Sequence, residues 1–152
     1  MPGLLPTFDR GPLTFAAHEN IPGGSVVMPA AAGRIQRAGV NSVLWLGVAL
    51  GDAAAYTYAP ADSLDPWGNS IANMDALVPN EVAVAFQGVF KLKVALATAA
   101  VNFGDLVKCA ALGEIQVHSQ GGAATLGMVV GRCVEPLGIV AGARGKIRLG
   151  GF

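Results

Sequence analysis

The chain has 152 residues, of which 53% are hydrophobic and 13% charged, and its ten basic and ten acidic residues cancel to a formal net charge of zero. This composition excludes a disordered protein and predicts one compact unit or two very small ones. Without a basic excess, no nucleic-acid partner that is held by phosphate neutralisation is expected. Near-zero net charge gives little repulsion between copies, which favours a subunit of an assembly.

Residues 1–22 are predicted to form an extended N-terminal arm. The segment contains four prolines, which remove ladder donors and favour extended backbone, and it has no basic region of the kind that begins a signal peptide. Such an arm is either a loose terminus or a strap over a neighbouring molecule. In a loose terminus four large apolar side chains would be exposed to water, so they are candidate interface residues: Leu4, Leu5, Phe8 and Phe15.

The remainder, residues 23–152, is predicted to be a single β domain made of two related units. Residues 24–36 match residues 104–116 at an offset of 80, and the same offset aligns 46–51 with 126–131. Without a gap, 10 of the 28 positions in 24–51 are identical to their partners. We therefore expect an internal duplication whose matched parts are about 23–52 and 103–132.

The residues between the matched glycines indicate strands. Apolar stretches of strand length alternate with Gly and Pro, and the glycines interrupt any helical stripe. The fold class predicted is all-β, an internally duplicated small β-barrel or β-sandwich of β-tulip-like form with at most one short helix. The predicted strands are 26–28, 34–37, 43–50, 91–94, 106–109, 114–118, 125–130 and 145–149.

An insertion is expected at about 53–80. Residues 70–78 could form its short helix. The oxygen-rich loop 62–69 lacks the spacing of a calcium loop, so turn chemistry explains it better than an ion site. Tyr58 and Trp67 are candidate interface anchors, because aromatic residues are enriched in interfaces.

The search for catalytic chemistry finds no candidate. His18 and His118 are 100 positions apart and are not equivalent in the repeat. No catalytic residue, cofactor-binding residue or metal ligand is expected. Cys109 and Cys133 are interpreted as buried free thiols, with a cross-strand disulfide as the alternative. Residues 142–146 are interpreted as a turn that leads into an exposed basic edge rather than a phosphate loop.

Targeting signals are also missing from the sequence as given. The apolar stretches are far shorter than the roughly 18–20 residues of a membrane helix, so no membrane partner is expected. An intracellular product is the default expectation.

The short motifs of the second unit support a resemblance. Gly104-Asp-Leu-Val107, then Gly113-Glu-Ile-Gln116, then Leu126-Gly-Met-Val-Val130 resemble the head decoration proteins of tailed double-stranded DNA bacteriophages, also called capsid cement or auxiliary proteins. Residues 86–150 match best. The first unit departs from the pattern, with Gly24-Ser25 where the family has Gly-Asp.

The resemblance implies a non-enzymatic structural protein. It implies a β-rich body that binds the outer surface of a phage capsid and stabilises the lattice of the major capsid protein, without a cofactor. The expected partners are the major capsid protein and further copies of the chain, a trimer above all. The expected location is the outer surface of the virion, after synthesis in the host cytoplasm.

Two functions of other classes stay open. A glycan- or small-molecule-binding β-barrel would use Trp45, Tyr56, Tyr58 and Trp67 in a pocket. A hydrolase would need one of the two histidines beside a carboxylate and a Ser or Cys.

Overall fold

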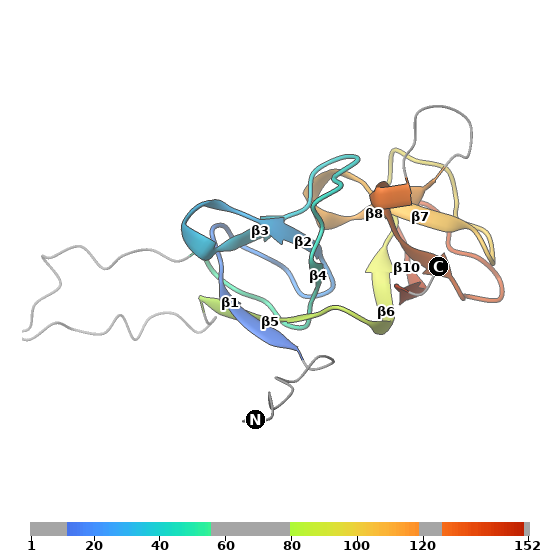
Figure 1. Ribbon diagram of the computed structural model, residues 1–152. Helices are drawn as coiled ribbons and strands as arrows, with labels where there is room; N and C mark the ends of the chain where they lie inside the picture. Colours follow the sequence, from blue (N-terminus) through green and yellow to red (C-terminus); the bar gives the residue numbers. More distant parts are fainter. Residues whose placement is uncertain (1–11, 56–79, 119–125, 151–152) are drawn as a thin grey trace, which may run out of the picture.

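The computed structural model describes residues 12–55, 80–118 and 126–150, and within these ranges the chain is all-β. Ten strands form two five-stranded antiparallel sheets, which lie side by side as two similar halves (Figure 1). Three single turns of 3-10 helix accompany them: η1 (Ala31–Gly33), η2 (Ala111–Gly113) and η3 (Leu126–Met128). The prediction of a duplicated all-β fold is confirmed. No helix of the described residues is long and apolar enough to cross a membrane.

The first sheet has the strand order β1-β5-β4-β2-β3. Its strands are β1 (Leu13–Ala16), β2 (Val26–Pro29), β3 (Ile35–Arg37), β4 (Gly47–Ala49) and β5 (Glu81–Ala85). The second sheet has the order β6-β10-β9-β7-β8. Its strands are β6 (Gly88–Lys93), β7 (Leu106–Cys109), β8 (Ile115–Val117), β9 (Val129–Cys133) and β10 (Arg144–Leu149).

Each sheet curls until its two outer strands meet. In the first half Ala17, just after β1, forms a parallel bridge with Ile35 of β3, and in the second half Val94 bridges Ile115 in the same way. The bridges cover sheet edges that would otherwise present unpaired backbone groups. Each half is therefore a small, nearly closed barrel.

The hairpin turns repeat in backbone detail. Ala32 and Leu112 both have a left-handed backbone, with φ of 57° and 59°, and each is followed by a glycine with positive φ. A left-handed residue other than Gly, Asn or Asp is uncommon, so its recurrence at equivalent positions is a specific match. The glycines that follow, Gly33 and Gly113, belong to the set on which the sequence repeat was identified.

The repeat contains a shift of four residues that the ungapped alignment missed. Val27 of β2 pairs with Gly47, whereas Val107 of β7 pairs with Gly131. Gly47 is therefore equivalent to Gly131 and not to Gly127. The predicted strand 125–130 is displaced accordingly, because residues 126–128 form η3 and β9 runs from Val129 to Cys133. The predicted strand 43–50 shortens to β4.

Part of the expected N-terminal arm belongs to the first barrel. Residues 13–16 form edge strand β1, which pairs with β5, and Ala17 and Ile21 are buried in the core. The physical reason is that the free edge of β5 has backbone groups that need hydrogen-bond partners, and Leu13–Ala16 supplies them. In the second half, β6 pairs with β10 in the same way. Residues 1–11 lie outside the described residues. The insertion also falls inside the first half, between β4 and β5, and its central part, 56–79 with the expected helix, is not described.

The two halves have separate interiors but share one contact surface. Val27, Ile35 and Val84 belong to the apolar cluster inside the first barrel. Val26 and Val48 point the other way and join the cluster that fills the second barrel. Alternation along β2 and β4 therefore places one apolar row inside the first barrel and another against the second barrel.

The docking of the halves depends on a close backbone approach at Gly113. Its N–H donates to the carbonyl oxygen of Ala38 at 2.9 Å. A Cβ at this position would lie 2.7 Å from the carbonyl oxygen of Val26 and 2.9 Å from Cβ of Ser25. A second backbone hydrogen bond, from Asn41 N–H to the carbonyl oxygen of Cys109 at 3.1 Å, crosses the same junction.

Replacing Gly131 by Ala is expected to destabilise the protein by about 2–4 kcal/mol, because the new Cβ would overlap the carbonyl oxygen of Arg148 on β10. Gly51→Ala is the matched control, since nothing lies within 4 Å of a Cβ there. Its effect on the free energy of unfolding should stay within about 0.5 kcal/mol. Urea titration of both variants measures the difference, and equal midpoints would contradict the placement of β9 against β10.

The two thiols are expected to be inert in the folded protein. Both cysteines are free and buried. Burial raises the pKa of Cys109 to about 12, and burial also raises the pKa of Cys133, with Asp105 and Glu135 adding to the rise. At pH 8 the thiolate fraction of Cys109 is then about 10⁻⁴, and the thiolate is the reactive form. Ellman titration should proceed quickly in 6 M guanidinium, as a fully denaturing control, and very slowly in native buffer. Rapid native labelling would contradict the buried placement.

Candidate functional site

Of the six side chains predicted as interface anchors, the structure describes Phe15. It lies on β1, is half-buried and packs against the apolar cluster of its own barrel. Its own barrel therefore covers part of its apolar surface, and its role as an interface residue stays a prediction. The remaining five lie outside the described residues: Leu4, Leu5, Phe8, Tyr58 and Trp67.

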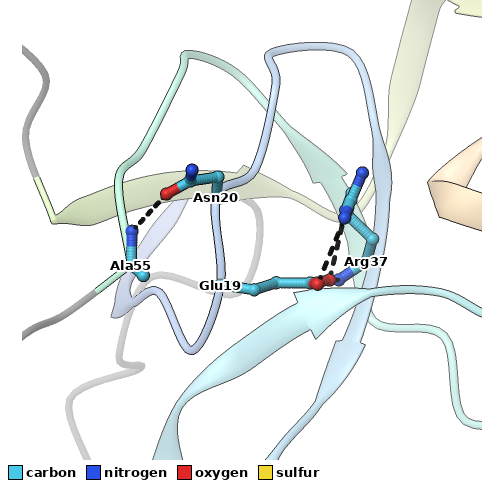
Figure 2. A network of polar contacts seen from close by, with 4 residues as sticks. All are labelled: Glu19, Asn20, Arg37 and Ala55. Carbon is cyan, nitrogen blue, oxygen red and sulfur yellow. Dashed lines mark hydrogen bonds and ion pairs between the residues drawn. The ribbon is translucent and has the colours of Figure 1, made fainter.

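A polar clamp holds the root of the insertion (Figure 2). Glu19 accepts hydrogen bonds from the backbone N–H of Arg37 at 2.8 Å and from its guanidinium at 3.2 Å. The neighbouring Asn20 accepts one from the backbone N–H of Ala55 at 2.8 Å. Ile21 and Ala53 exchange two backbone hydrogen bonds of 2.8 Å between these contacts. The segment after β1 thereby fixes both β3 and the point from which residues 56–79 depart.

A shallow hollow of about 310 Å³ lies at the same root. Asn20, Ile21, Pro22 and residues 52–54 line it. The carboxylate of Asp52 on its wall accepts a hydrogen bond from the backbone N–H of Gly23 at 2.6 Å. The described lining contains no histidine, serine or cysteine, and Asp52 is its one ionisable side chain.

A smaller hollow of about 160 Å³ lies where the halves meet. Arg37 of the first half and Lys93, Glu114 and Arg144 of the second half line it. The Lys93 ammonium lies 2.7 Å from the Glu114 carboxylate, and the Arg144 guanidinium donates to the carbonyl oxygen of Gly23 at 3.3 Å. These contacts add a polar rim to the apolar junction.

Two hydrogen-bonded loops of the second half carry exposed large apolar side chains. Residues 95–104 and 134–143 are tied together by two hydrogen bonds between Val101 and Ile139, of 2.9 and 2.7 Å. We call these loops the apolar loop surface. Its exposed members are Leu96, Phe103, Leu137 and Val140, with exposures of 77%, 64%, 99% and 68%. Large apolar side chains grouped this way mark interaction surfaces more often than scattered ones do.

The candidates for catalysis and metal binding do not converge in the described part of the chain. His18 is exposed, whereas His118 is buried and its Nδ1 has no hydrogen-bond partner there. No group of three His, Cys, Asp or Glu residues is placed to hold a metal ion among the described residues. The 142–146 segment is a turn that enters β10, as interpreted from the sequence.

The aromatic residues of the glycan alternative are not brought into a pocket by the described part. Trp45 is half-buried and packs against the core that joins the halves. Tyr56, Tyr58 and Trp67 lie outside the described residues.

Sequence reasoning missed the apolar loop surface. Leu96, Phe103 and Leu137 have no large apolar residue next to them in the sequence, and Val140 has only Ile139, so no periodicity marked them. The available signal was their position in loops, where a large apolar side chain has no core to enter.

Replacing Glu19 by Gln is expected to lower stability by about 0.5 kcal/mol at pH 7, since the ion pair with Arg37 is partly exposed. The hydrogen bond from the Arg37 side chain lowers the pKa of Glu19, even though partial burial acts in the opposite direction. A carboxyl whose pKa is lowered on folding stabilises the protein above its unfolded pKa of about 4.3, and this contribution is lost as pH falls through the folded pKa.

Chemical denaturation at several pH values tests this prediction. The difference between wild type and Glu19→Gln should shrink as pH falls below the unfolded pKa of about 4.3. A difference that does not change with pH would contradict the ion-pair origin. Asp52→Asn serves as a second carboxylate variant outside the clamp.

The comparisons with known proteins identify a fold. No protein-family model and no curated protein sequence matches the chain. The chain is similar to the crystal structure of the head fiber gp8.5 N base of bacteriophage phi29, with a TM-score of 0.59 and 12% sequence identity. The likeness covers 91% of this chain and 92% of that chain, so the two share the arrangement of both barrels rather than one sheet.

Proposed function

We propose that this chain is a non-enzymatic structural protein of a bacteriophage head, which binds the outer surface of the capsid and stabilises the lattice of the major capsid protein. The observation that carries the proposal is the likeness to the phi29 head fiber base over nearly the whole of both chains. The motifs of the second half that resemble head decoration proteins support the same role from the sequence. The chain then belongs to the virion and has the capsid protein as its partner.

The apolar loop surface is the described region best suited to contact a shell. Leu137 is almost fully exposed, and Leu96 and Val140 are also exposed on the same two loops. Burying such side chains against a partner stabilises a complex by roughly 25 cal/mol per Å² of apolar surface removed from water. Many copies on one lattice multiply a modest single contact through avidity.

Residues outside the described ranges extend this proposal. Leu4, Leu5 and Phe8 in the arm, and Tyr58 and Trp67 in the insertion, are the proposed anchors between copies or on the shell. Buried aromatic anchors commonly contribute about 2 kcal/mol or more each. A trimer is the proposed assembly.

Purified protein is expected to co-sediment with mature heads that were assembled without it, and to raise the temperature at which they release their genome, because a ligand that binds the intact lattice stabilises it by mass action. The double variant Leu137→Ser, Val140→Ser should bind at least about ten-fold more weakly, since two exposed apolar contacts are lost. Its thermal midpoint should match that of wild type.

Val43→Ser, Leu44→Ser is the matched control. These side chains are similarly exposed, at 52% and 64%, but lie on a loop of the first half. Shell binding of the control should equal that of wild type. Failure of the wild-type protein to co-sediment with intact mature heads would overturn the proposed function. Equal loss in both double variants would show that the apolar loop surface is not the contact.

A further inference from the structure

The zero net charge of the chain conceals two oppositely charged halves. Residues 1–87 contain three basic and seven acidic residues, whereas residues 88–152 contain seven basic and three acidic ones. The halves therefore carry formal charges of −4 and +4. Net charge predicts colloidal behaviour, but the distribution of charge decides which surfaces attract a charged partner.

Six of the seven cations of the second half lie on one face of its sheet. Side chains alternate along β10, so Gly145, Ile147 and Leu149 are buried while the residues between them are exposed. Strands β6 and β9, which flank β10, contribute the others. We call this set the basic face: Lys91, Lys93, Arg132, Arg144, Lys146 and Arg148.

The register places these cations directly opposite one another. Lys146 of β10 faces Lys91 of β6, and Arg144 faces Lys93. On the other side of β10, Arg148 faces Arg132 of β9. Like charges directly opposite in an antiparallel pair destabilise the sheet, so the basic face opposes folding at three places.

Only one row of the basic face is compensated within the described residues. Lys93 pairs with Glu114 at 2.7 Å, and Arg144 donates to a backbone carbonyl oxygen. The side chains of Lys91, Lys146, Arg148 and Arg132 have no acidic partner in that part of the chain. Within the described residues, these four cations are therefore the ones open to a partner.

The first half shows that the fold does not need these charges. The pair Thr14–Ala83 occupies the place of Lys91–Lys146. The pair Val48–Ala85 occupies the place of Arg132–Arg148. The same barrel is thus built with neutral residues at these two pairs, which removes a structural reason for the repulsion in the second half.

The partner that this face fits is a protein surface rich in carboxylates. The row formed by Lys93 and Arg144 stands at the strand ends from which the apolar loop surface continues, with Leu96 and Val140 exposed there. A cationic area beside exposed aliphatic side chains matches a protein interface, whereas phosphates alone would make no use of the aliphatic part. No aromatic side chain is exposed on the described strands of this face for bases to stack on.

The described part of a second copy is a weaker partner. Glu19 is paired with Arg37, and Glu114 with Lys93. Asp52, Asp105 and Glu135 each accept a hydrogen bond from a backbone N–H. Glu81 is exposed on β5, so the described residues present a single open carboxylate rather than a cluster.

We propose that the basic face docks onto a carboxylate-rich protein surface, with the apolar loop surface beside it completing the contact. The proposal rests on the proposed function only in identifying the partner that carries this surface as the shell protein. Cations arranged in this way accelerate encounter and fix orientation, and their contribution decreases with salt.

Binding of the full chain to poly-L-glutamate tests the proposal directly. Wild type should bind at 50 mM salt and lose at least about ten-fold in affinity by 200 mM, because exposed charges are screened over about 10 Å at 0.1 M. The triple variant Lys91→Gln, Lys146→Gln, Arg148→Gln should bind at least about ten-fold more weakly. The charge-preserving triple Lys91→Arg, Lys146→Arg, Arg148→Lys is the matched control and should retain binding.

The thermal stability of a charge-reversal variant is a second readout. If the cations served only to stabilise the fold, reversing one of them would lower Tm. Lys91→Glu converts the repulsion with Lys146 into attraction, so Tm should rise by about 1–3 °C while binding to poly-L-glutamate falls. Unchanged affinity of the neutralised triple variant would overturn the proposal. Tighter binding of duplex DNA than of poly-L-glutamate at the same salt would overturn it in favour of a polyphosphate partner.

Shell binding separates this proposal from the proposed function. If wild type fails to bind mature heads, the proposed function fails whatever poly-L-glutamate shows. If wild type binds heads and the neutralised triple variant binds them equally well at 50 and 200 mM salt, the basic face is not the contact while the proposed function stands.

Discussion

The approach of Gly113 to the backbone of Val26 is the constraint on which the arrangement of the two barrels depends. Any side chain at this position would overlap the carbonyl oxygen of Val26, and the positive φ of 72° would strain it further. Because the approach is this close, the N–H of Gly113 reaches Ala38, and Val26 and Val48 pack into the core of the second barrel. The junction is therefore continuous with a hydrophobic core and holds the charged rim and both flanking surfaces in fixed positions.

The equivalent turn of the first half makes no such contact. A Cβ on Gly33 would meet nothing within 4 Å, and Ala31 and Ala32 are exposed. The barrels are thus docked head to tail, with the turn of the second on the flank of the first. A twofold arrangement would have buried both turns, as an isologous interface uses the same patch on both partners.

The sequence predicted strand positions best where the backbone geometry of a turn restricts which residue types can occupy it. The turns at Ala32 and Leu112 need left-handed backbone followed by glycine, so the motif was preserved in both halves and marked strands β2, β3, β7 and β8. Beyond Gly39 the constraint relaxes, and Leu46-Gly47 matched Leu126-Gly127 by coincidence. The true equivalent, Gly131, is fixed by its contact with β10, which is a long-range relation that no local pattern contains.

Strands β1 and β5 were missed for a related reason. Leu13-Thr-Phe-Ala16 is short and lies in a segment with four prolines, and its assignment depends on pairing with β5 across the insertion.

The candidate surfaces could not be predicted from the sequence either. Alternation in residues 145–149 predicted an exposed basic strand, but only the register shows that its cations face those of β6 and β9.

The same comparison shows how the outward rows of the two halves differ. In the first half the outward row of β2 and β4 is Val26 and Val48, which the second barrel covers. The equivalent row in the second half is Leu106 and Arg132, paired in the same register. Arg132 is exposed, and burying this row would be costly, because an unpaired charge would be removed from water. The outward row of β2 and β4 in the first half is thus part of a core, whereas the equivalent row of β7 and β9 in the second half carries an exposed charge. Divergence at a few outward positions was enough, since the inward positions that build each barrel kept their apolar character.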